Sequence, residues 1–281
     1  MTVDSRKLCH KLSTNNCQLS TKFNYQLILE QTHFLGIDVG ASAIKGALVD
    51  ISTGELTEKR FRIDMPKEST PQNVAGVIHD IVKHFKYKGQ IGVGFPSVVK
   101  KGVAVTAANL DKSWIGCNIE ETVSSATNCK VVALNDADAA GLAEMRFGLG
   151  KNVKGTVVLI TIGTGLGSAV FTDGHLLKNT EFGHILMKNG MIGERYAADS
   201  ARKREDLPLK KWAKRFNEYL QLIELYLQPQ IILLGGGTSK DFDEFKDKIK
   251  ISTPVVPAQL LNNAGIVGAA MFAAESIKIT N

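Results

Sequence analysis

The feature of the sequence that most constrains the fold is a pattern that occurs twice. A short apolar run, a turn of small residues, a second strand-like run and another tight turn begin at Phe34, and the same order begins again at Thr156. Apolar runs of this length bounded by glycine predict strands. Because each copy starts a unit of its own, the repeat predicts two α/β domains with a cleft between them. The two copies cover residues 34–50 and 156–171.

Helices and further strands follow each copy. Thr70 and Pro71 predict the start of a helix that continues with apolar residues at helical spacing to Phe85. A longer amphipathic helix is predicted over 209–227, ended by Pro229. The other predicted elements are a third strand over 57–63, strands at 91–95, 131–134 and 231–234, helices at 137–147 and 264–276, a helix capped by Ser239, and loops between 96 and 127.

Residues 1–33 differ from the rest of the chain. They are rich in Ser, Thr, Asn and Lys, so little in them offsets the entropy of ordering, and they predict a flexible extension. A transit peptide is the alternative. Transit peptides are rich in arginine, however, and Arg6 is the only arginine in this segment. No apolar run approaches the ~18 residues that a membrane span needs, and no signal peptide is recognisable. We therefore expect a cytoplasmic protein without a membrane partner.

The net charge and the spacing of the cysteines limit the kinds of ligand that we expect. The net charge of +6 suits a polyanionic ligand. Lys and Arg form no clustered stripe with interleaved aromatic residues, so no nucleic-acid partner is expected. The four cysteines have neither CxxC nor zinc-ligand spacing, which predicts reduced thiols without a special role.

Three turns of small residues are candidate phosphate-binding loops. Small side chains let a turn approach a polyanion, which backbone N–H groups can then bind. The first turn follows Asp38, whose carboxylate could hold Mg²⁺ through water. An ordinary tight hairpin beside a buried carboxylate is the alternative. Neither GxxxxGK[ST] nor a strand-linked GxGxxG occurs, which excludes two common nucleotide motifs. The three turns are 40–45, 163–165 and 235–237.

Two pairs of polar residues are candidates for the chemistry itself. Asp136 follows a predicted strand and begins a predicted helix, where a carboxylate can accept a hydroxyl proton during phosphoryl transfer. The alternative is that Asp136 or Asp138 only caps the helix. Glu181 and His184 could bind neighbouring sugar hydroxyls. The alternatives are that Glu181 and His184 bind a metal ion, or that they are an ordinary Glu–His pair on a surface loop.

Taken together, these motifs resemble the ROK sugar kinases of the actin–hexokinase–Hsp70 superfamily, over about Phe34 to Ala274. Three segments resemble those of the polyphosphate-using members of that family, namely Thr106–Gly116, Asn135–Glu144 and Asn179–Glu181. The resemblance rests on the combination of segments, each of which is common alone. The segments of the family pattern are 38–46, 135–144, 161–168, 181–184, 231–240 and 265–270.

The resemblance implies an α/β fold of two ribonuclease-H-like (actin-like ATPase) domains, 34–134 plus 262–281 and 135–261, usually in a homodimer. It implies glucose phosphorylation at the 6-hydroxyl by inorganic polyphosphate, with ATP open as a second donor, and Asp136 as general base. Glucose would be held by Asn109, Asn135, Glu181 and His184, and Mg²⁺ would lie near Asp38. The donor would be bound by Gly40, Ala41, Ser42, Ala43, Ile44, Lys45, Gly163, Thr164, Gly165 and, for a nucleotide, Gly235, Gly236 and Gly237.

The sequence departs from the family pattern in two places. Residues 185–281 contain no cysteine, so the zinc of many ROK proteins is not expected. Ala41 and Ala43 stand where glycines are usual in the family. Their added methyl groups restrict the backbone conformations that the first turn can adopt. The alternatives are an ATP-dependent hexokinase or N-acylhexosamine kinase, a ROK regulator without catalysis, and an inactive sugar-binding protein. A regulator would need a helix-turn-helix domain, for which residues 1–33 are too short.

Overall fold

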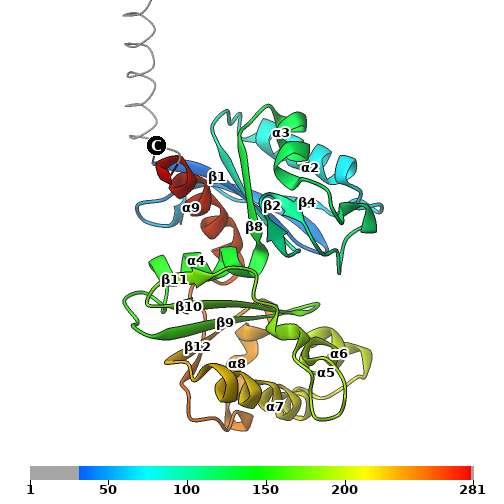
Figure 1. The fold of residues 1–281 in the computed structure, drawn as a ribbon, viewed down its shortest axis with the longest axis vertical. Coiled ribbons are helices and arrows are strands. Elements are labelled where there is room, and N and C mark those ends of the chain that lie inside the picture. Colours follow the sequence, from blue (N-terminus) through cyan, green and yellow to red (C-terminus); the bar gives the residue numbers. More distant parts are fainter. Residues whose placement is uncertain (1–31, 280–281) are drawn as a thin grey trace, which may run out of the picture. The chain divides into compact units, whose positions relative to one another are not determined.

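The computed structural model describes residues 32–279, with the side chains of 278 and 279 left out. The predicted extension 1–33 therefore lies outside the described residues, apart from its last two. Residues 34–279 form one compact unit that contains two large sheets and a two-stranded hairpin (Figure 1). We call each sheet with the helices on its outer face a lobe. The predicted domain boundaries at 134/135 and 261/262 stay a prediction.

The first lobe is built on a six-stranded sheet in the order β3-β2-β1-β5-β8, with β4 also paired to β2. The repeated motif supplies β1 and β2, and β5 and β8 extend the sheet by parallel pairing from β1. The carboxyl ends of β1 and β8 thus lie at the same edge. The strands are β1 (His33–Val39), β2 (Ala43–Asp50), β3 (Glu55–Leu56), β4 (Phe61–Asp64), β5 (Ile91–Phe95) and β8 (Val131–Asn135).

The single third strand predicted over Thr57–Ile63 is wrong. The chain instead makes two short strands, β3 and β4, which both pair with β2. Between them lie four polar residues, three of them exposed, that have no apolar face to bury. Arg60 in this stretch donates to Asn263 Oδ1 at 3.1 Å. This contact holds the stretch against the C-terminal segment.

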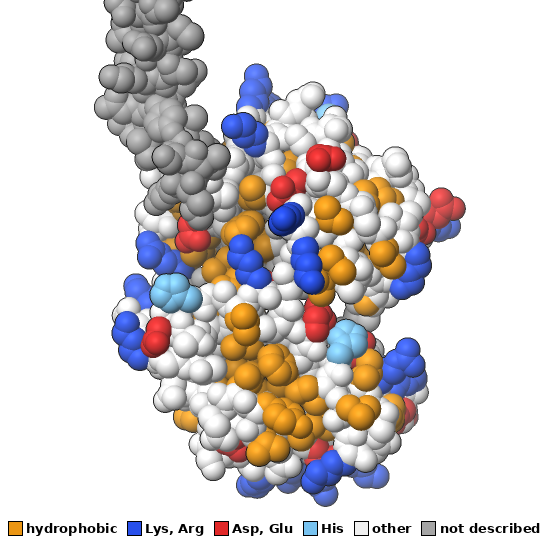
Figure 2. All heavy atoms as spheres, viewed as in Figure 1, with side chains coloured by type: hydrophobic (Ala, Val, Ile, Leu, Met, Phe, Trp, Pro, Cys, Tyr) orange, Lys and Arg blue, Asp and Glu red, His pale blue; other side chains and the backbone are white. Residues whose placement is uncertain are grey.

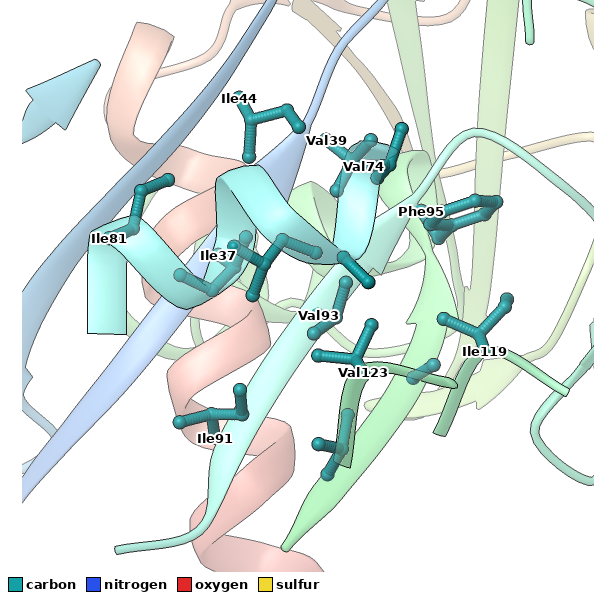
Figure 3. Close-up of a cluster of buried hydrophobic side chains, with 14 of the residues drawn as sticks. Ile37, Val39, Ile44, Val74, Ile81, Ile91, Val93, Phe95, Ile119 and Val123 are labelled. Carbon is teal, nitrogen blue, oxygen red and sulfur yellow. The ribbon is translucent and has the colours of Figure 1, made fainter. Parts of the chain in front are cut away.

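Two helices cover the outer face of the first sheet, α2 (Pro71–His84) and α3 (Ile119–Thr127). Thr70 caps α2 as predicted, since its side chain accepts the N–H of Asn73. The helix α3 was missed, because only its buried Ile119, Val123 and Thr127 carry the helical pattern. Figure 3 shows how side chains of both helices meet those of the central strands. The labelled core residues are Ile37, Val39, Ile44, Val74, Ile81, Ile91, Val93, Phe95, Ile119 and Val123.

The second lobe has a five-stranded sheet in the order β11-β10-β9-β12-β13. The second copy of the motif supplies β9 and β10, which pair antiparallel around the turn at 163–165. The long predicted helix α7 covers this sheet and buries Trp212, Phe216 and Leu220. The elements are β9 (Thr156–Ile162), β10 (Leu166–Thr172), β11 (His175–Leu177), β12 (Ile231–Gly235), β13 (Val255–Pro257), α5 (Gly193–Ala197), α6 (Asp199–Arg204), α7 (Leu209–Leu227) and α8 (Phe242–Phe245).

Short elements complete the chain. A hairpin of β6 (Val99–Lys100) and β7 (Val103–Ala104) follows β5. Ser239 caps no α-helix, because it lies inside a 3₁₀ turn and donates to Gly236 O. Within residues 32–279 no helix is long and apolar enough to cross a membrane. The 3₁₀ turns are η1 (Lys112–Trp114), η2 (Phe182–His184), η3 (Gly237–Asp241), η4 (Lys246–Lys248) and η5 (Leu261–Asn263).

Two helices, α4 (Asp136–Phe147) and α9 (Ala264–Ile279), lie on the inner side of the sheets (Figure 1). α9 packs on β5, β2 and β8 of the first sheet and on α4, which in turn contacts β10 of the second. This packing needs glycine, because a Cβ on Gly92 would run into the carbonyl of Ala269, and one on Gly268 into that of Ala139. The backbones therefore approach directly, and α4 is held between the lobes.

Candidate functional site

A cavity of about 700 Å³ lies between the two lobes. In Figure 2 the surface is notched there, with acidic and histidine side chains beside the notch. Two other cavities, along α7 and beside η4, contain none of the predicted site residues. The predicted residues that line the cavity between the lobes are Ala41, Asn109, Asn135, Asp136, Gly163, Thr164, Gly165, Glu181, His184, Gly236 and Gly237.

Asp136 is the first residue of α4 and faces this cavity. The sequence left open whether it only caps the helix. The cap is Asn135, whose Oδ1 accepts the N–H groups of Ala137 and Asp138 at 2.9 and 3.1 Å. Burial, reinforced by the charge of Asp38 and then by that of Glu181, raises the pKa of Asp136 to about 7, although its bond from Ala137 N–H opposes the shift. A carboxyl with this pKa can exchange a proton near neutral pH.

Asn135 is buried and largely committed to the fold. In addition to the two bonds to its Oδ1, its Nδ2 donates to the carbonyl of Ser97 at 3.1 Å. An amide has two N–H donors, so one remains for a ligand. Any contact of Asn135 with a sugar would therefore be a single donated hydrogen bond from a fixed side chain.

Glu181 immediately precedes the 3₁₀ turn η2 on the second lobe, and His184 is the last residue of that turn. His184 Nδ1 lies 3.3 Å from Glu181 Oε2, and His184 Nε2 lies 3.9 Å from Glu194 Oε1. Burial raises the pKa of Glu181 despite the opposing interaction with His184, and the charge of Glu194 adds to the rise. The three side chains form a row of acceptors and donors on one wall, which is suited to neighbouring hydroxyl groups.

Glu194 is the site residue that sequence reasoning missed. It lines the cavity from the first turn of α5, and a Cβ on Gly165 would contact its Oε2. In the local sequence Glu194 is marked only by its position after Gly193 at a helix start. Acidic residues are common at helix N-termini, so this position does not indicate a binding site. Only the packing of α5 against η2 brings it beside His184.

The glycine turn of the second copy reaches the cavity. Gly163 N–H donates to Gly165 O at 3.1 Å and closes the turn, and Ser200 of α6 bonds to the carbonyls of Gly163 and Thr164. Gly236 lies next to it with φ of +81° and ψ of 178°, a conformation open almost only to glycine. Gly235 ends β12 in register with Thr161 and, unlike Thr161, does not line the cavity.

The first turn contributes less. Of residues 40–45 only Ala41 lines the cavity, and the side chains of Ala43 and Ile44 are buried in the core. Gly40 N–H donates to Ala43 O at 3.0 Å. Lys45 Nζ lies 3.3 Å from Asp38 Oδ2, so the lysine and the predicted metal-binding carboxylate form an ion pair. The roles assigned to this turn stay a prediction.

The donor set at Asp38 fits magnesium better than zinc. Within the described part of the chain no three His, Cys, Asp or Glu side chains gather as a metal site. Mg²⁺ is commonly held by one or two carboxylates with water and substrate phosphates, so it needs no such cluster. Asp38 lies close enough to Asp136 for its charge to act on the Asp136 pKa. Two carboxylates near the glycine turns are therefore compatible with magnesium on a phosphate donor.

Comparison with known proteins identifies the family. The sequence pattern of the ROK family matches residues 34–198. This chain belongs to the ROK family. Within the family it is 48% identical over 242 residues to the polyphosphate glucokinase of Mycobacterium tuberculosis strain CDC 1551, covering 86% of this chain and 91% of that protein. It is 45% identical over 237 residues to the polyphosphate glucokinase of Mycobacterium leprae, covering 84% and 73%.

Solved ROK structures share the fold. The inorganic polyphosphate/ATP-glucomannokinase of Arthrobacter sp. strain KM superposes with a TM-score of 0.85 at 40% identity, covering 88% of this chain and 100% of that one. A ROK glucokinase of Streptomyces griseus, solved with glucose and AMPPNP, has a TM-score of 0.74 at 23% identity, covering 86% and 99%, and supports the fold alone. The predicted fold class, α/β with two actin-like ATPase domains about a cleft, is confirmed.

Proposed function

We propose that this chain transfers a phosphoryl group from inorganic polyphosphate to the 6-hydroxyl of glucose, and that ATP is a second donor. The observation that carries the proposal is the position of Asp136. Its carboxyl faces a cavity that has hydroxyl-binding side chains on one wall and glycine turns on another. The similarity to two mycobacterial polyphosphate glucokinases supports the choice of sugar and donor.

The sugar is bound by Asn109, Asn135, Glu181 and His184. We add Glu194, because its Oε1 lies on the far side of the His184 ring from Glu181. Carboxylates accept hydrogen bonds from hydroxyls, and the imidazole and the amides donate or accept. These fixed groups hold the sugar with its 6-hydroxyl toward Asp136, and positioning of this kind supplies much of the rate gain in phosphoryl transfer.

Asp136 acts as the general base. Its ionised carboxylate accepts the proton of the 6-hydroxyl as the sugar oxygen bonds to the terminal phosphorus of the donor. The bond between that phosphorus and its bridging oxygen breaks, and the shortened polyphosphate leaves with the bond electrons. A base with a pKa of about 7 is half ionised at neutral pH, where the proton can still move readily.

The donor lies against the glycine turns. Backbone N–H groups around 163–165 and 236–237, with Ala41 opposite, bind its terminal oxygens. Magnesium, when bound, neutralises charge on the donor oxygens, and Asp38 is the residue that would hold it through water. The chain's own part is to fix the donor and to exclude water, which limits hydrolysis.

The deciding experiment is glucose 6-phosphate formation with purified polyphosphate and no nucleotide. We expect product with polyphosphate and with ATP, and none without a donor. Product with ATP alone would replace this proposal by the ATP-dependent hexokinase alternative, and phosphorylation of N-acetylmannosamine but not glucose by the N-acylhexosamine kinase alternative. No product with any donor would indicate a regulator or an inactive sugar-binding protein.

The homodimer and the cytoplasmic location belong to the same proposal, as the family resemblance implies them. Light scattering after size-exclusion chromatography tests the first. A mass of twice 30.5 kDa is expected, and a mass of 30.5 kDa would exclude the dimer at that concentration.

A further inference from the structure

Asn179 joins three separate elements without lining the cavity. Its side-chain Oδ1 accepts the N–H of Val99 at 2.8 Å, and its Nδ2 donates to the carbonyl of the same residue at 2.9 Å. Its own backbone N–H donates to Asp138 Oδ2 at 2.8 Å. The amide thus pairs with Val99 as a neighbouring strand would, and the backbone binds α4. We call this set of three bonds the Asn179 clamp.

Each clamped element leads to a wall of the proposed sugar site. Val99 lies in β6, and the hairpin continues into residues 105–109, which line the cavity. This hairpin is held to itself by bonds from Val105 N–H to Val98 O and from Val98 N–H to Thr106 Oγ1, at 2.8 and 3.0 Å. A displacement of Val99 is therefore passed to the segment that carries Asn109.

The second element is the loop that carries Glu181. Ser168 Oγ donates to Thr180 O at 2.7 Å and accepts the N–H of Phe182 at 3.0 Å, which fixes the loop on β10. Asn179 immediately precedes this fixed stretch. It has a φ of +60°, a conformation that asparagine tolerates better than most other residues.

The third element is α4, at Asp138, two residues after the proposed base. Asp138 is only 1% exposed, and its Oδ1 has no hydrogen-bond partner within the described residues. Burial, opposed by the bond from Asn179 and reinforced by Glu181, raises the Asp138 pKa to about 7. The charge of Lys178 opposes this rise as well. Burying a carboxyl is costly, and among the described residues the Asn179 N–H is the one hydrogen-bond partner of the Asp138 side chain.

We propose that Asn179 is a positioning residue of the sugar site. By joining the hairpin, the Glu181 loop and α4, the Asn179 clamp holds the walls that carry Asn109, Glu181 and Asp136 at a fixed spacing before the sugar arrives. Preorganisation of this kind lowers the ordering cost of binding. The inference rests on the proposed function, since it assigns the three walls to glucose.

The test variant is Asn179→Gly, which removes the side-chain bonds and still accepts a φ of +60°. Asn152→Gly is the matched control, because Asn152 is exposed and has a φ of +63°. We expect the KM for glucose and the calorimetric Kd for glucose to rise about tenfold or more in Asn179→Gly, as expected for the loss of two partly buried hydrogen bonds. The KM for polyphosphate should stay within about twofold of wild type, and Asn152→Gly should leave both KM values unchanged.

A second readout does not depend on glucose. The amide of Val99 donates to Asn179 Oδ1, so its hydrogen exchange should be faster in Asn179→Gly and unchanged in Asn152→Gly. Asn179→Asp keeps the acceptor but not the donor, and it should show a smaller rise in the glucose KM. It also serves as the variant to measure should Asn179→Gly not fold.

Two results would overturn the inference. One is faster exchange with an unchanged glucose KM, which would make the clamp a structural bond only. The other is an equal loss of affinity for glucose and polyphosphate. Absence of glucose phosphorylation by the wild-type chain would instead overturn the proposed function, and the exchange result at Val99 would stand independently.

Discussion

Asp136 and Asp138 lie two residues apart on the first turn of α4, and burial raises the pKa of each to about 7, yet only Asp136 lines the cavity. The Asp138 side chain points instead into protein, where it binds the Asn179 N–H. Two carboxyls of similar pKa thus have different surroundings. A comparison of variants at the two positions therefore separates the effect of a raised pKa from that of facing the cavity.

The first prediction concerns catalysis by this pair. Asp136→Asn should lower kcat by ~10²–10⁴-fold, the usual contribution of a general base. Asp138→Asn should stay within about threefold of wild type, because asparagine keeps an acceptor for the Asn179 N–H. Steady-state kinetics with glucose and either donor measures both. Similar losses in the two variants would contradict the role of Asp136.

The pH profile gives a second prediction. The base must be ionised, so log kcat/KM of the wild type should fall with a slope of one as pH drops below about 7, and level off above it. The profile is measured over pH 5–9 with a donor that keeps its own charge constant. A profile that stays flat down to pH 5 would mean that the proton acceptor is another group.

Stability should depend on pH through Asp138. Its folded pKa of about 7 lies above the ordinary value of 3.8, so the folded state binds the proton more tightly. The proton on Asp138 therefore stabilises the folded state. This stabilisation is complete below pH 3.8 and is lost as the pH rises through 7. Between pH 4 and 8 the wild type should lose on the order of 4 kcal/mol of unfolding free energy relative to Asp138→Asn. Urea unfolding of both proteins measures this, and a difference that is constant with pH would refute it.

Gly236 is predicted to be irreplaceable at the donor end of the cavity. Alanine there would have to adopt a φ of +81°, and its Cβ would meet the carbonyl of Ile162. Gly236→Ala should lower the melting temperature and raise the donor KM, with a cost of about 1–3 kcal/mol from the backbone alone. Gly237→Ala is the control, since nothing lies within 4 Å of a Cβ at that position. Equal effects in both variants would argue against the conformational cause.

The final prediction concerns Lys112, which lines the cavity and donates to Ala107 O. If polyphosphate is bound by charge, its apparent affinity should fall as NaCl rises, and Lys112→Ala should weaken it and flatten that dependence. Lys130→Ala is the control, because Lys130 lies at the opposite end of β8 from Asn135. The KM for polyphosphate at several salt concentrations decides between the two outcomes.

Local pattern predicted the elements that carry their signal in consecutive residues. The strands of the repeated motif, the helix after Thr70 and the amphipathic helix α7 all occur as expected. α3 was missed because its nine residues include two serines and two threonines, and the third strand was split by exposed polar residues. Tertiary pairing with β2 decides that region, and pairing has no local sign.

The site could be predicted as far as its residues follow strand ends and glycine turns. Asp136 and the turn 163–165 were found in this way and do meet at one cavity. Glu194 and Asn179 were not assigned a role, because their importance depends on contacts made only in the folded chain. Glu194 lies beside His184, and Asn179 binds the backbone of Val99, 80 positions away in the sequence. Ala43 and Ile44 lie on opposite faces of β2, and both are buried because helices α2 and α9 each pack against this strand.

The packing of α9 has a consequence for how the protein is made. Phe34, Ala47 and Val49 of the first strands are buried beneath Ile266, Val267 and Ala270, which are synthesised long after them. While the chain is being synthesised, α2 and α3 can cover one side of the first sheet, but the other side stays bare until α9 has emerged from the ribosome. The first lobe is thus completed only after the second lobe has been made, and until then the nascent chain exposes an apolar surface.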